Sequence, residues 1–302
     1  MSVQNYLLRR KPYKELLDSE IGLPLINKKD FALQILPKGK NNIVLGISFD
    51  YALRFLLKFE FQEKVEFKEP HLLISVLGLN DLRTKLSQND VFTTIKDKIL
   101  IKHPSQKLLE RLNIADANSS AAINYYFSNG RLEKPYLESL IFYAYLEIYF
   151  RGGQLYETFD KFDLSDIDEL SELISSVDLN IFRPKKSIEL NPDFGLLSKF
   201  IKGADADLIV DDLLLDFKLV QDLSHFRQYF NQIFTYYLLS KIEGVKEINS
   251  IGLYFARHCQ TYVIPISKIA PAKNLANVQK WLDKDLKYLN GIGRKKVIKK
   301  KS

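Results

Sequence analysis

The residues best suited to chemistry lie in one short stretch, Lys202–Leu219, where acids and a lysine interrupt an apolar run. If Asp211–Asp212 forms a two-residue turn, as β-hairpins favour, Asp207 lies opposite Asp216. Side chains alternate along a strand, so Lys218 lies on the same face as Asp216. The spacing therefore predicts a hairpin that gathers two carboxylates and one ammonium group on a single face.

The two faces of this hairpin are expected to differ in polarity. One face carries Asp205, Asp207, Ile209, Leu214, Asp216 and Lys218, and the other carries Ala206, Leu208, Val210, Leu213, Leu215 and Phe217. A turn of three residues would change the parity and separate the two acids, so the register decides whether a site can form.

Two carboxylates that face each other across a hairpin repel, unless a cation lies between them. Mg²⁺, or Mn²⁺ in its place, binds carboxylate oxygens together with waters and substrate phosphates. Such an ion polarises a phosphoryl oxygen and acidifies a bound water. Lys218 could position that water and offset the charge on the phosphate. The pattern predicts metal-assisted hydrolysis of phosphodiester bonds, with Asp207 and Asp216 as metal ligands.

An acid followed two residues later by a lysine is not specific by itself. Glu66-Phe67-Lys68 and Asp285-Leu286-Lys287 have the same spacing. Only Asp216-Phe217-Lys218 lies in an apolar strand pattern with a second acid at the matched hairpin position. We therefore interpret only this triplet as functional.

The periodicity from residue 186 onward indicates an α/β fold. The expected strands are Ser187–Leu190, Ala206–Val210, Leu213–Lys218, Ile251–Ala256 and Thr261–Ile266. A long helix is expected at Ser224–Lys241, between the third and fourth strands, and a buried helix at Pro135–Arg151 precedes them all. The resulting order is helix, three strands, helix and two strands.

The first part of the chain has a mainly helical pattern. The expected elements there are helices at Phe49–Lys58 and Pro104–Leu112 and a strand at Leu72–Leu77. Small and polar residues at 115–120 and 128–130 indicate loop, and an exposed acidic helix is expected at Ser165–Ser176. We therefore expect an N-terminal region at 1–130, a core domain at 131–290 and a basic tail at 291–302.

The hairpin resembles the PD-(D/E)XK nuclease superfamily, whose restriction-endonuclease-like core is a helix, a three-stranded sheet, a helix and a further strand. In that family an acid in the second strand and an acid-x-Lys motif in the third bind metal and activate water. The resemblance implies that Asp207 is the first acid and Asp216-Phe217-Lys218 the second motif. Pro192-Asp193 also lies at a permitted spacing and is the alternative first acid.

RecB-type members of this superfamily add a Gln-x-x-x-Tyr motif on the following helix. Gln232 and Tyr236 match it, which implies a place for both near the phosphate path. Five residues are expected to form the apolar stripe of this helix, namely Phe226, Tyr229, Phe230, Ile233 and Tyr237. They leave a polar row, namely His225, Gln228, Gln232 and Tyr236.

RecB-type nucleases also place Gly-x-x-x-His-x-x-Leu on an early helix, with the His as a metal ligand. The segment 46–53 follows that spacing with Asp50 in place of the His, so the resemblance makes Asp50 a candidate metal ligand. Glu147, which also lies on an expected helix, is the alternative to Asp50 as the acid that completes the site. Glu147 could instead form an ion pair with Arg151 one turn later.

Charge and composition restrict the function classes. The chain has 302 residues and a net charge of +7, and six bases without an acid lie in 294–302, so the preceding residues carry only +1. Cys259 is the only cysteine, which excludes an internal disulfide and favours a reducing, cytoplasmic location. No apolar segment reaches the length of a membrane span, so no membrane partner is expected.

Two functions agree with these patterns. The first is a Mg²⁺-dependent nuclease that acts on DNA rather than RNA, in defence or repair, with an N-terminal region that shapes the substrate groove or binds a protein partner. The alternative is a catalytically inactive subunit that keeps the nuclease fold and binds nucleic acid or a protein partner.

Overall fold

The computed structural model describes residues 3–22, 26, 31–70, 73–195 and 206–300. The chain forms two compact units that alternate along the sequence. Unit 1 consists of Met1–Leu33, Val65–Glu69 and Ile181–Ser302, and unit 2 consists of Gln34–Lys64 and Pro70–Asn180. Each unit has its own sheet, so the protein has a mixed α/β fold.

Unit 1 is built on a six-stranded mixed sheet with the order β1-β5-β6-β7-β8-β9. Its strands are β1 (Glu66–Lys68), β5 (Ser187–Leu190), β6 (Leu208–Val210), β7 (Leu213–Lys218), β8 (Ser250–Phe255) and β9 (Gln260–Pro265). Its helices are α1 (Val3–Arg9), α2 (Lys11–Glu20), α9 (Phe226–Glu243) and α10 (Ala272–Lys300). Its short 3₁₀ turns are η3 (Ala256–His258) and η4 (Ile266–Lys268), whereas η2 (Leu179–Phe182) begins in the last residues of unit 2 and ends in unit 1.

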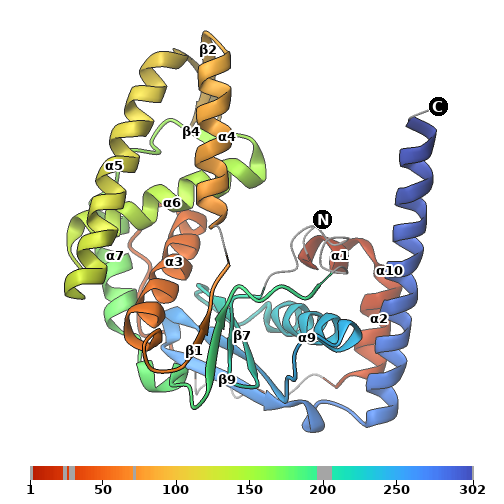
Figure 1. The fold of residues 1–302 in the computed structure, drawn as a ribbon. Coiled ribbons are helices and arrows are strands. Elements are labelled where there is room, and N and C mark those ends of the chain that lie inside the picture. Colours follow the sequence, from red (N-terminus) through yellow and green to blue (C-terminus); the bar gives the residue numbers. More distant parts are fainter. Residues whose placement is uncertain (1–2, 23–25, 27–30, 71–72, 196–205, 301–302) are drawn as a thin grey trace. The chain divides into compact units, whose positions relative to one another are not determined.

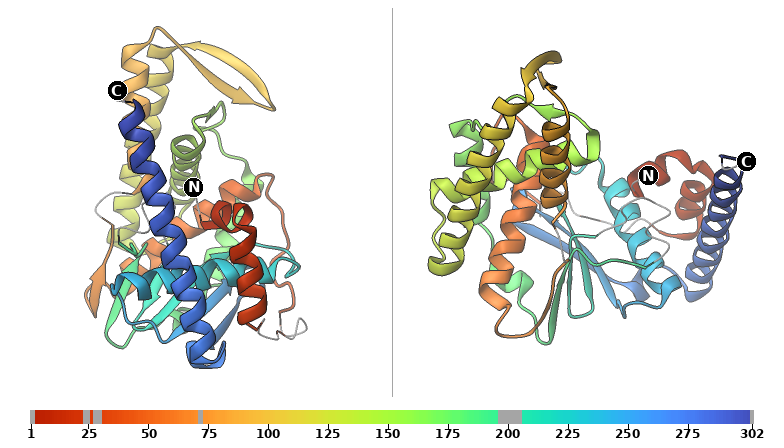
Figure 2. Two further views of the ribbon diagram at one scale, coloured as in Figure 1. Left: turned by 90° about the vertical axis from the view of Figure 1, so that its right-hand side faces the viewer. Right: turned by 45° about the horizontal axis from the view of Figure 1, so that its top comes forward.

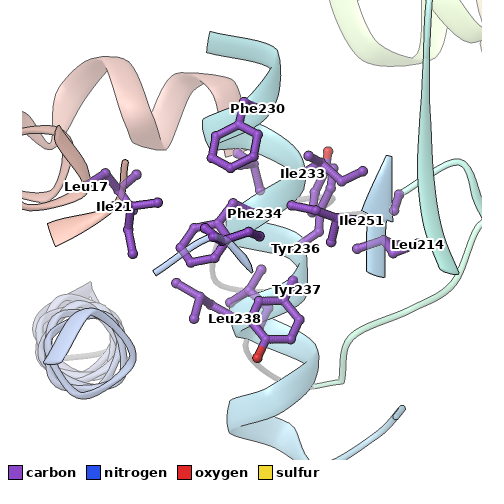
Figure 3. Packing of buried hydrophobic residues seen from close by; sticks show 14 of the residues in the cluster. Leu17, Ile21, Leu214, Phe230, Ile233, Phe234, Tyr236, Tyr237, Leu238 and Ile251 are labelled. Carbon is purple, nitrogen blue, oxygen red and sulfur yellow. The ribbon is translucent and has the colours of Figure 1, made fainter. Parts of the chain in front are cut away.

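The helix α9 connects two parallel neighbours, β7 and β8, and covers one face of the sheet (Figure 1). The side of α9 away from the sheet is covered in turn by α1, α2 and α10 (Figure 2). Figure 3 shows both contacts: Ile233 of α9 approaches Leu214 and Ile251 of the sheet, and Leu17 and Ile21 of the α2 segment lie on the other side. All residues of α9 from 231 to 240 are therefore buried.

Unit 2 is a helical bundle with a small three-stranded sheet, β3-β2-β4. Its helices are α3 (Asn42–Phe61), α4 (Ile74–Gln88), α5 (Ser105–Asn129), α6 (Lys134–Gly152) and α7 (Leu164–Ser175). Its strands are β2 (Val91–Lys96), β3 (Ile99–Pro104) and β4 (Leu155–Tyr156). The central helix α6 packs against α3, α4, α5 and α7, and the β2–β3 hairpin extends beyond the helices (Figure 2, left).

The C-terminal half follows the sequence expectation closely. The strands β5 and β7 have the expected bounds, the bounds of β8, β9 and α9 differ by one or two residues, and β6 begins two residues later than expected. The buried helix α6 is also confirmed, and Gly153 ends it in a left-handed conformation with φ of +75°.

Two local expectations in the first part of the chain are wrong. Residues 74–77 begin the helix α4, because Gly78 permits close packing: a Cβ there would overlap the backbone oxygen of Leu146 in α6. The expected loop at 115–120 lies within α5, whose buried residues recur at helical spacing and include Leu112, Ser119 and Ile123. Short apolar runs and polar stretches can both be helical, because tertiary packing outweighs local sequence preference.

The helix α7 is amphipathic rather than exposed as expected. Two of its acids, Asp166 and Glu169, are buried because they accept backbone N–H groups from the loop before α3. The Glu169 carboxylate accepts from Lys38 and Gly39, each at 2.6 Å. These bonds stabilise the two acidic side chains in their buried positions.

The boundaries of the two units differ from those of the expected segments 1–130, 131–290 and 291–302. Residue 130 lies between α5 and α6, two helices that pack against each other within unit 2. The strand β1 pairs in parallel with β5 although the two are far apart in the chain. At the C-terminal end, the backbone of α10 continues as helix to Lys300.

We expect Phe234→Ala to destabilise unit 1 by about 3–5 kcal/mol, because this fully buried ring lies between the sheet and the outer helices and stacks on Phe230. Urea unfolding followed by fluorescence of Trp281, the only tryptophan, measures this change. Tyr288→Ala on α10 is the control, since Tyr288 is 64% exposed and should change stability by less than about 0.5 kcal/mol. Equal midpoints for the two variants would contradict the packing.

Candidate active site

A two-residue turn joins β6 and β7, as the sequence predicts. The paired residues are Leu208 with Leu215, Ile209 with Leu214 and Val210 with Leu213. Asp211 adopts a left-handed backbone with φ of +54°, which Asp tolerates better than most residues. Its carboxylate accepts the backbone N–H groups of 185–187 at 2.8–3.0 Å. These bonds connect the turn to the strand β5 and fix the register.

Asp207 stands just before β6 and opposite Asp216, as this register requires. Its Oδ2 accepts the backbone N–H of Phe217 at 2.6 Å. Its own carbonyl oxygen accepts the N–H of Asn191 at 3.0 Å. The carboxylate of Asp207 is thus held against β7, next to the carboxyl group of Asp216.

Asp216 and Lys218 form a buried ion pair between Oδ2 and Nζ, with side chains only 4% and 12% exposed. Burial raises the pKa of Asp216 most strongly. The Lys218 ammonium lowers this pKa and the Asp207 carboxylate raises it further, which leaves the pKa of Asp216 at about 7. Burial alone would lower the pKa of Lys218, but the carboxylates of Asp216 and Asp207 raise it above its ordinary value. Lys218 is therefore charged at neutral pH.

The helix α9 completes the cluster. Lys218 Nζ donates to Gln232 Oε1 at 3.1 Å, and Gln232 Nε2 donates to the hydroxyl of Tyr236 at 3.0 Å. The ring of Tyr236 stacks on Phe194 with centroids 5.8 Å apart. The structure therefore brings together five of the residues expected from sequence: Asp207, Asp216, Lys218, Gln232 and Tyr236.

Tyr229 belongs to the site although the sequence interpretation placed it in the apolar stripe. The ammonium of Lys218 lies over its ring, 5.3 Å from the centroid. The sequence spacing could have indicated this position, because Tyr229 lies three residues before Gln232 and so shares its helix face. The expected polar row is only partly present: His225 and Gln228 are exposed, whereas Gln232 and Tyr236 are buried.

Both faces of the hairpin are covered at their middle positions. Ile209 and Leu214, on the face with the acids, are buried in the core under α9. The other face is buried too, and there Phe217 meets the rings of Phe182 and Tyr254 edge-on. Since both faces are covered, the acids lie at the end of a buried strand rather than on a charged surface.

Asp50 and Glu147 belong to unit 2 and have partners there. The carboxylate of Glu147 accepts the hydroxyl of Tyr51 at 2.7 Å and pairs with Arg151 at 2.8 Å, as the alternative interpretation expected. Asp50 forms an ion pair with Arg54 one turn later on α3. The assignment of either residue to the metal site remains a prediction.

The alternative first acid, Asp193, is exposed, and its Oδ1 accepts the N–H of Gly195 at 2.8 Å. Asp205, expected on the acidic face, lies outside the described residues. Of the two candidates for the first acid, Asp207 is the one that the hairpin places opposite Asp216.

The residues that the structure describes contain no group of three or more His, Cys, Asp or Glu side chains that could hold a metal ion. The paired carboxyl groups of Asp207 and Asp216 are nevertheless chemically suited to Mg²⁺ or Mn²⁺, which need only one or two carboxylates when waters and substrate phosphates supply the rest. A buried carboxyl group with a raised pKa beside a second acid is a typical place for a cation to replace a proton.

No protein-family model, curated protein or solved structure matches the chain. Across the described residues, no helix is long and apolar enough to cross a membrane.

We expect the free energy of unfolding in EDTA to fall as pH rises through the pKa of Asp216. The folded state binds this proton more tightly than the unfolded chain, whose Asp pKa is near 3.9, so the stabilisation is complete below about pH 4 and is lost above about pH 7. Between pH 5 and pH 8 the loss is roughly 2–3 kcal/mol.

Urea unfolding of the wild type and Asp216→Asn at both pH values measures this contribution. The amide keeps the shape of the side chain but does not titrate, so the variant should lack that part of the pH dependence. Asp193→Asn, at an exposed acid, should behave like the wild type. An identical pH dependence in the wild type and Asp216→Asn would contradict the raised pKa.

Proposed function

We propose that this protein is a metal-dependent nuclease that hydrolyses phosphodiester bonds in DNA. One observation carries the proposal: two acids, a lysine, a glutamine and a tyrosine from three separate segments meet at one end of β7. A purely structural hairpin gains nothing from placing a second carboxylate opposite the buried carboxylate of Asp216, since the two repel each other.

The order of elements supports a restriction-endonuclease-like core of the PD-(D/E)XK type. Three antiparallel strands, β5, β6 and β7, are followed by the crossover helix α9, and β8 then pairs in parallel with β7. The ends of parallel strands are where α/β folds commonly bind ligands. The cluster lies at the carboxyl end of β7, in the position where the PD-(D/E)XK resemblance expects the catalytic residues.

In this proposal Asp207 and Asp216 hold Mg²⁺ or Mn²⁺. The ion would supply polarisation of a phosphoryl oxygen and acidification of a bound water. Because the pKa of Lys218 is raised, its role is electrostatic: the ammonium orients the attacking water and offsets charge on the phosphate. A neutral lysine acting as a base would require a lowered pKa instead.

Gln232 and Tyr236 act in the proposal as positioning residues. Both side chains are more than 90% buried, so contact with a phosphate backbone is not their main role. Gln232 fixes the direction of the Lys218 ammonium, and Tyr236 fixes the orientation of the Gln232 amide. The stacked ring of Phe194 holds Tyr236 in turn.

One observation favours the alternative of an inactive nuclease-fold subunit that binds nucleic acid or a protein. The Lys218 ammonium already neutralises a carboxylate oxygen of Asp216 that a metal ion would need. Activity therefore requires this ion pair to rearrange when metal and phosphate bind. Cleavage assays separate the two functions.

We expect the purified chain to cleave linear or single-stranded DNA with Mg²⁺ or Mn²⁺ and not with EDTA. Asp207→Ala, Asp216→Ala and Lys218→Ala should each lower the rate at least about hundredfold, because each removes a group that stabilises the transition state. Asp193→Ala should retain activity, which would exclude it as the first acid.

The chain offers a matched control in Glu66 and Lys68 of β1. They form an exposed ion pair with the same acid-x-Lys spacing and in the same unit. Glu66→Ala and Lys68→Ala should leave the rate unchanged. Cleavage that survives Asp216→Ala and Lys218→Ala would show that the activity arises elsewhere, and DNA binding without cleavage would favour the inactive alternative.

The basic tail is expected to bind phosphates without sequence preference. Removal of 294–302 should reduce the slope of log affinity against log salt by about 0.9 for each phosphate that the tail neutralises. A salt titration of binding to labelled DNA measures the slope. Lys280→Ala, at an exposed lysine in α10, controls for removal of a single charge. An unchanged slope after truncation would show that the tail does not touch the phosphates.

A further inference from the structure

The β2–β3 hairpin of unit 2 presents a free strand edge to solvent. β3 lies at one edge of its three-stranded sheet and pairs only with β2 among the strands that the structure describes. The hairpin extends beyond the helices of its unit (Figure 2, left), and the residues of β3 are exposed or half-buried throughout. The free edge of a sheet is a template to which another strand can add.

The hairpin register shows which backbone groups face this free edge. Asp97–Lys98 is a two-residue turn in which both residues have positive φ, +49° and +68°. In such a hairpin the pair that closes the turn, Lys96 with Ile99, is hydrogen-bonded, and the hydrogen-bonded pairs then alternate. The N–H and C=O groups of Leu100 and Lys102 therefore point away from β2.

The contact with β4 supports the same parity independently. Ile95 of β2 lies opposite Leu100, and its carbonyl oxygen accepts the N–H of Glu157, just after β4, at 2.9 Å. Because Ile95 forms its hydrogen bond on the β4 side, its partner Leu100 directs its own groups to the free side of β3. Leu100 and Lys102 thus each offer one donor and one acceptor to a strand added there.

Aliphatic side chains flank this edge on both faces of the hairpin. Ile99 is 65% exposed and Leu100 is 66% exposed, and adjacent residues of a strand point to opposite faces. An added strand would cover both side chains, and burial of apolar surface is favourable. Aliphatic side chains form no hydrogen bonds with base edges or phosphates, so these residues fit a polypeptide better than a nucleic acid.

Lysines restrict the charge of the strand that can be added. Lys96, Lys98 and Lys102 are all exposed, and Asp97 is the only acid between residues 91 and 104. Lysines at a sheet edge oppose pairing between two copies of one chain, because like charges repel across the new pair. The same lysines attract a strand that carries carboxylates. The hairpin therefore complements an acidic partner rather than a second copy of itself.

We propose that β3 binds an extended acidic segment of a partner protein, which adds to the sheet as a further strand. The partner's side chains opposite Ile99, Leu100 and Ile101 are apolar, and acids flank them opposite Lys102 and beside Lys98. The recognised pattern is thus acid, three apolar residues and acid. The proposal goes beyond the nuclease function and does not depend on it, because the hairpin lies in unit 2 and contains none of the active-site cluster.

Fluorescence anisotropy of a labelled peptide titrated with the full chain tests the proposal. The probe is Ser-Thr-Glu-Val-Val-Val-Glu-Thr-Ser, which should bind one per chain. Gln in place of both Glu residues should weaken binding at least about threefold, because it removes two opposite-charge contacts. Pro in place of the central Val should weaken it at least about tenfold, because it removes the N–H that pairs with Leu100.

Substitutions in the hairpin give the complementary test. Leu100→Pro removes an outward N–H while it leaves the β2–β3 ladder intact, and it should weaken probe binding at least about tenfold. Leu100→Thr keeps that N–H and should retain more binding than Leu100→Pro. Lys102→Glu should weaken probe binding at least about threefold and strengthen binding of the peptide with Lys in place of both Glu residues. Lys280→Glu, at an exposed lysine of α10, is the matched control.

Amide hydrogen exchange of the wild type checks the position without any substitution. Saturating probe should slow exchange in 99–103 and leave α5 unchanged. The proposal is overturned if the probe does not bind, if Pro in the peptide or Leu100→Pro has no effect, or if exchange in 99–103 is unchanged. It is also overturned if Lys102→Glu has no more effect than Lys280→Glu.

Two further results would assign the edge to a different occupant and so also overturn the proposal. Sedimentation velocity of the free chain should show a monomer, and a dimer that Leu100→Pro dissociates would make a second copy the occupant. Duplex DNA that displaces the probe more effectively than unlabelled probe does would assign the hairpin to nucleic acid.

Discussion

Asp211 holds a left-handed backbone conformation while its carboxylate accepts three backbone N–H groups from 185–187. These hydrogen bonds fix a two-residue turn and align β5, β6 and β7 in a single register. The parity of that register places Asp207 opposite Asp216 and sends both toward the face covered by α9. One more residue in the turn would send Asp207 to the opposite face and disperse the cluster.

The hairpin was predictable because its signals are local. A two-residue acidic turn between apolar runs sets the register, and strand alternation then fixes the faces. The helical motif of Gln232 and Tyr236 was predictable for the same reason, since four-residue spacing defines a helix face. The cation–π contact of Tyr229 and the burial of Asn231 depend on what packs around α9, which no local pattern contains.

The errors share a physical origin in long-range packing. The polar stretch at 115–120 is helical because α5 packs along α6, and the apolar run near Ile74 is helical because Gly78 admits the backbone of α6. The pairing of β1 with β5 also joins segments that are far apart in the chain. Composition cannot show such a pairing, because it depends on tertiary contacts.

Burial is the feature that links the site's electrostatics to its proposed chemistry. With only +1 of net charge outside the tail, the rest of the chain offers little long-range attraction to a polyanion. The adjacent carboxyl groups of Asp207 and Asp216 would repel a phosphate, and a bound cation would reverse that effect. The low exposure that raises the pKa of Asp216 also strengthens its attraction to a cation once its proton is lost.

If Asp207 and Asp216 hold a divalent cation, electron paramagnetic resonance of Mn²⁺ titrated into the intact protein at pH 8 will detect it. We expect one bound Mn²⁺ per chain that is lost in both Asp207→Asn and Asp216→Asn and retained in Glu66→Gln. Mn²⁺ binding that is unchanged by either of the first two substitutions, or absent from the wild type with DNA present, would contradict it.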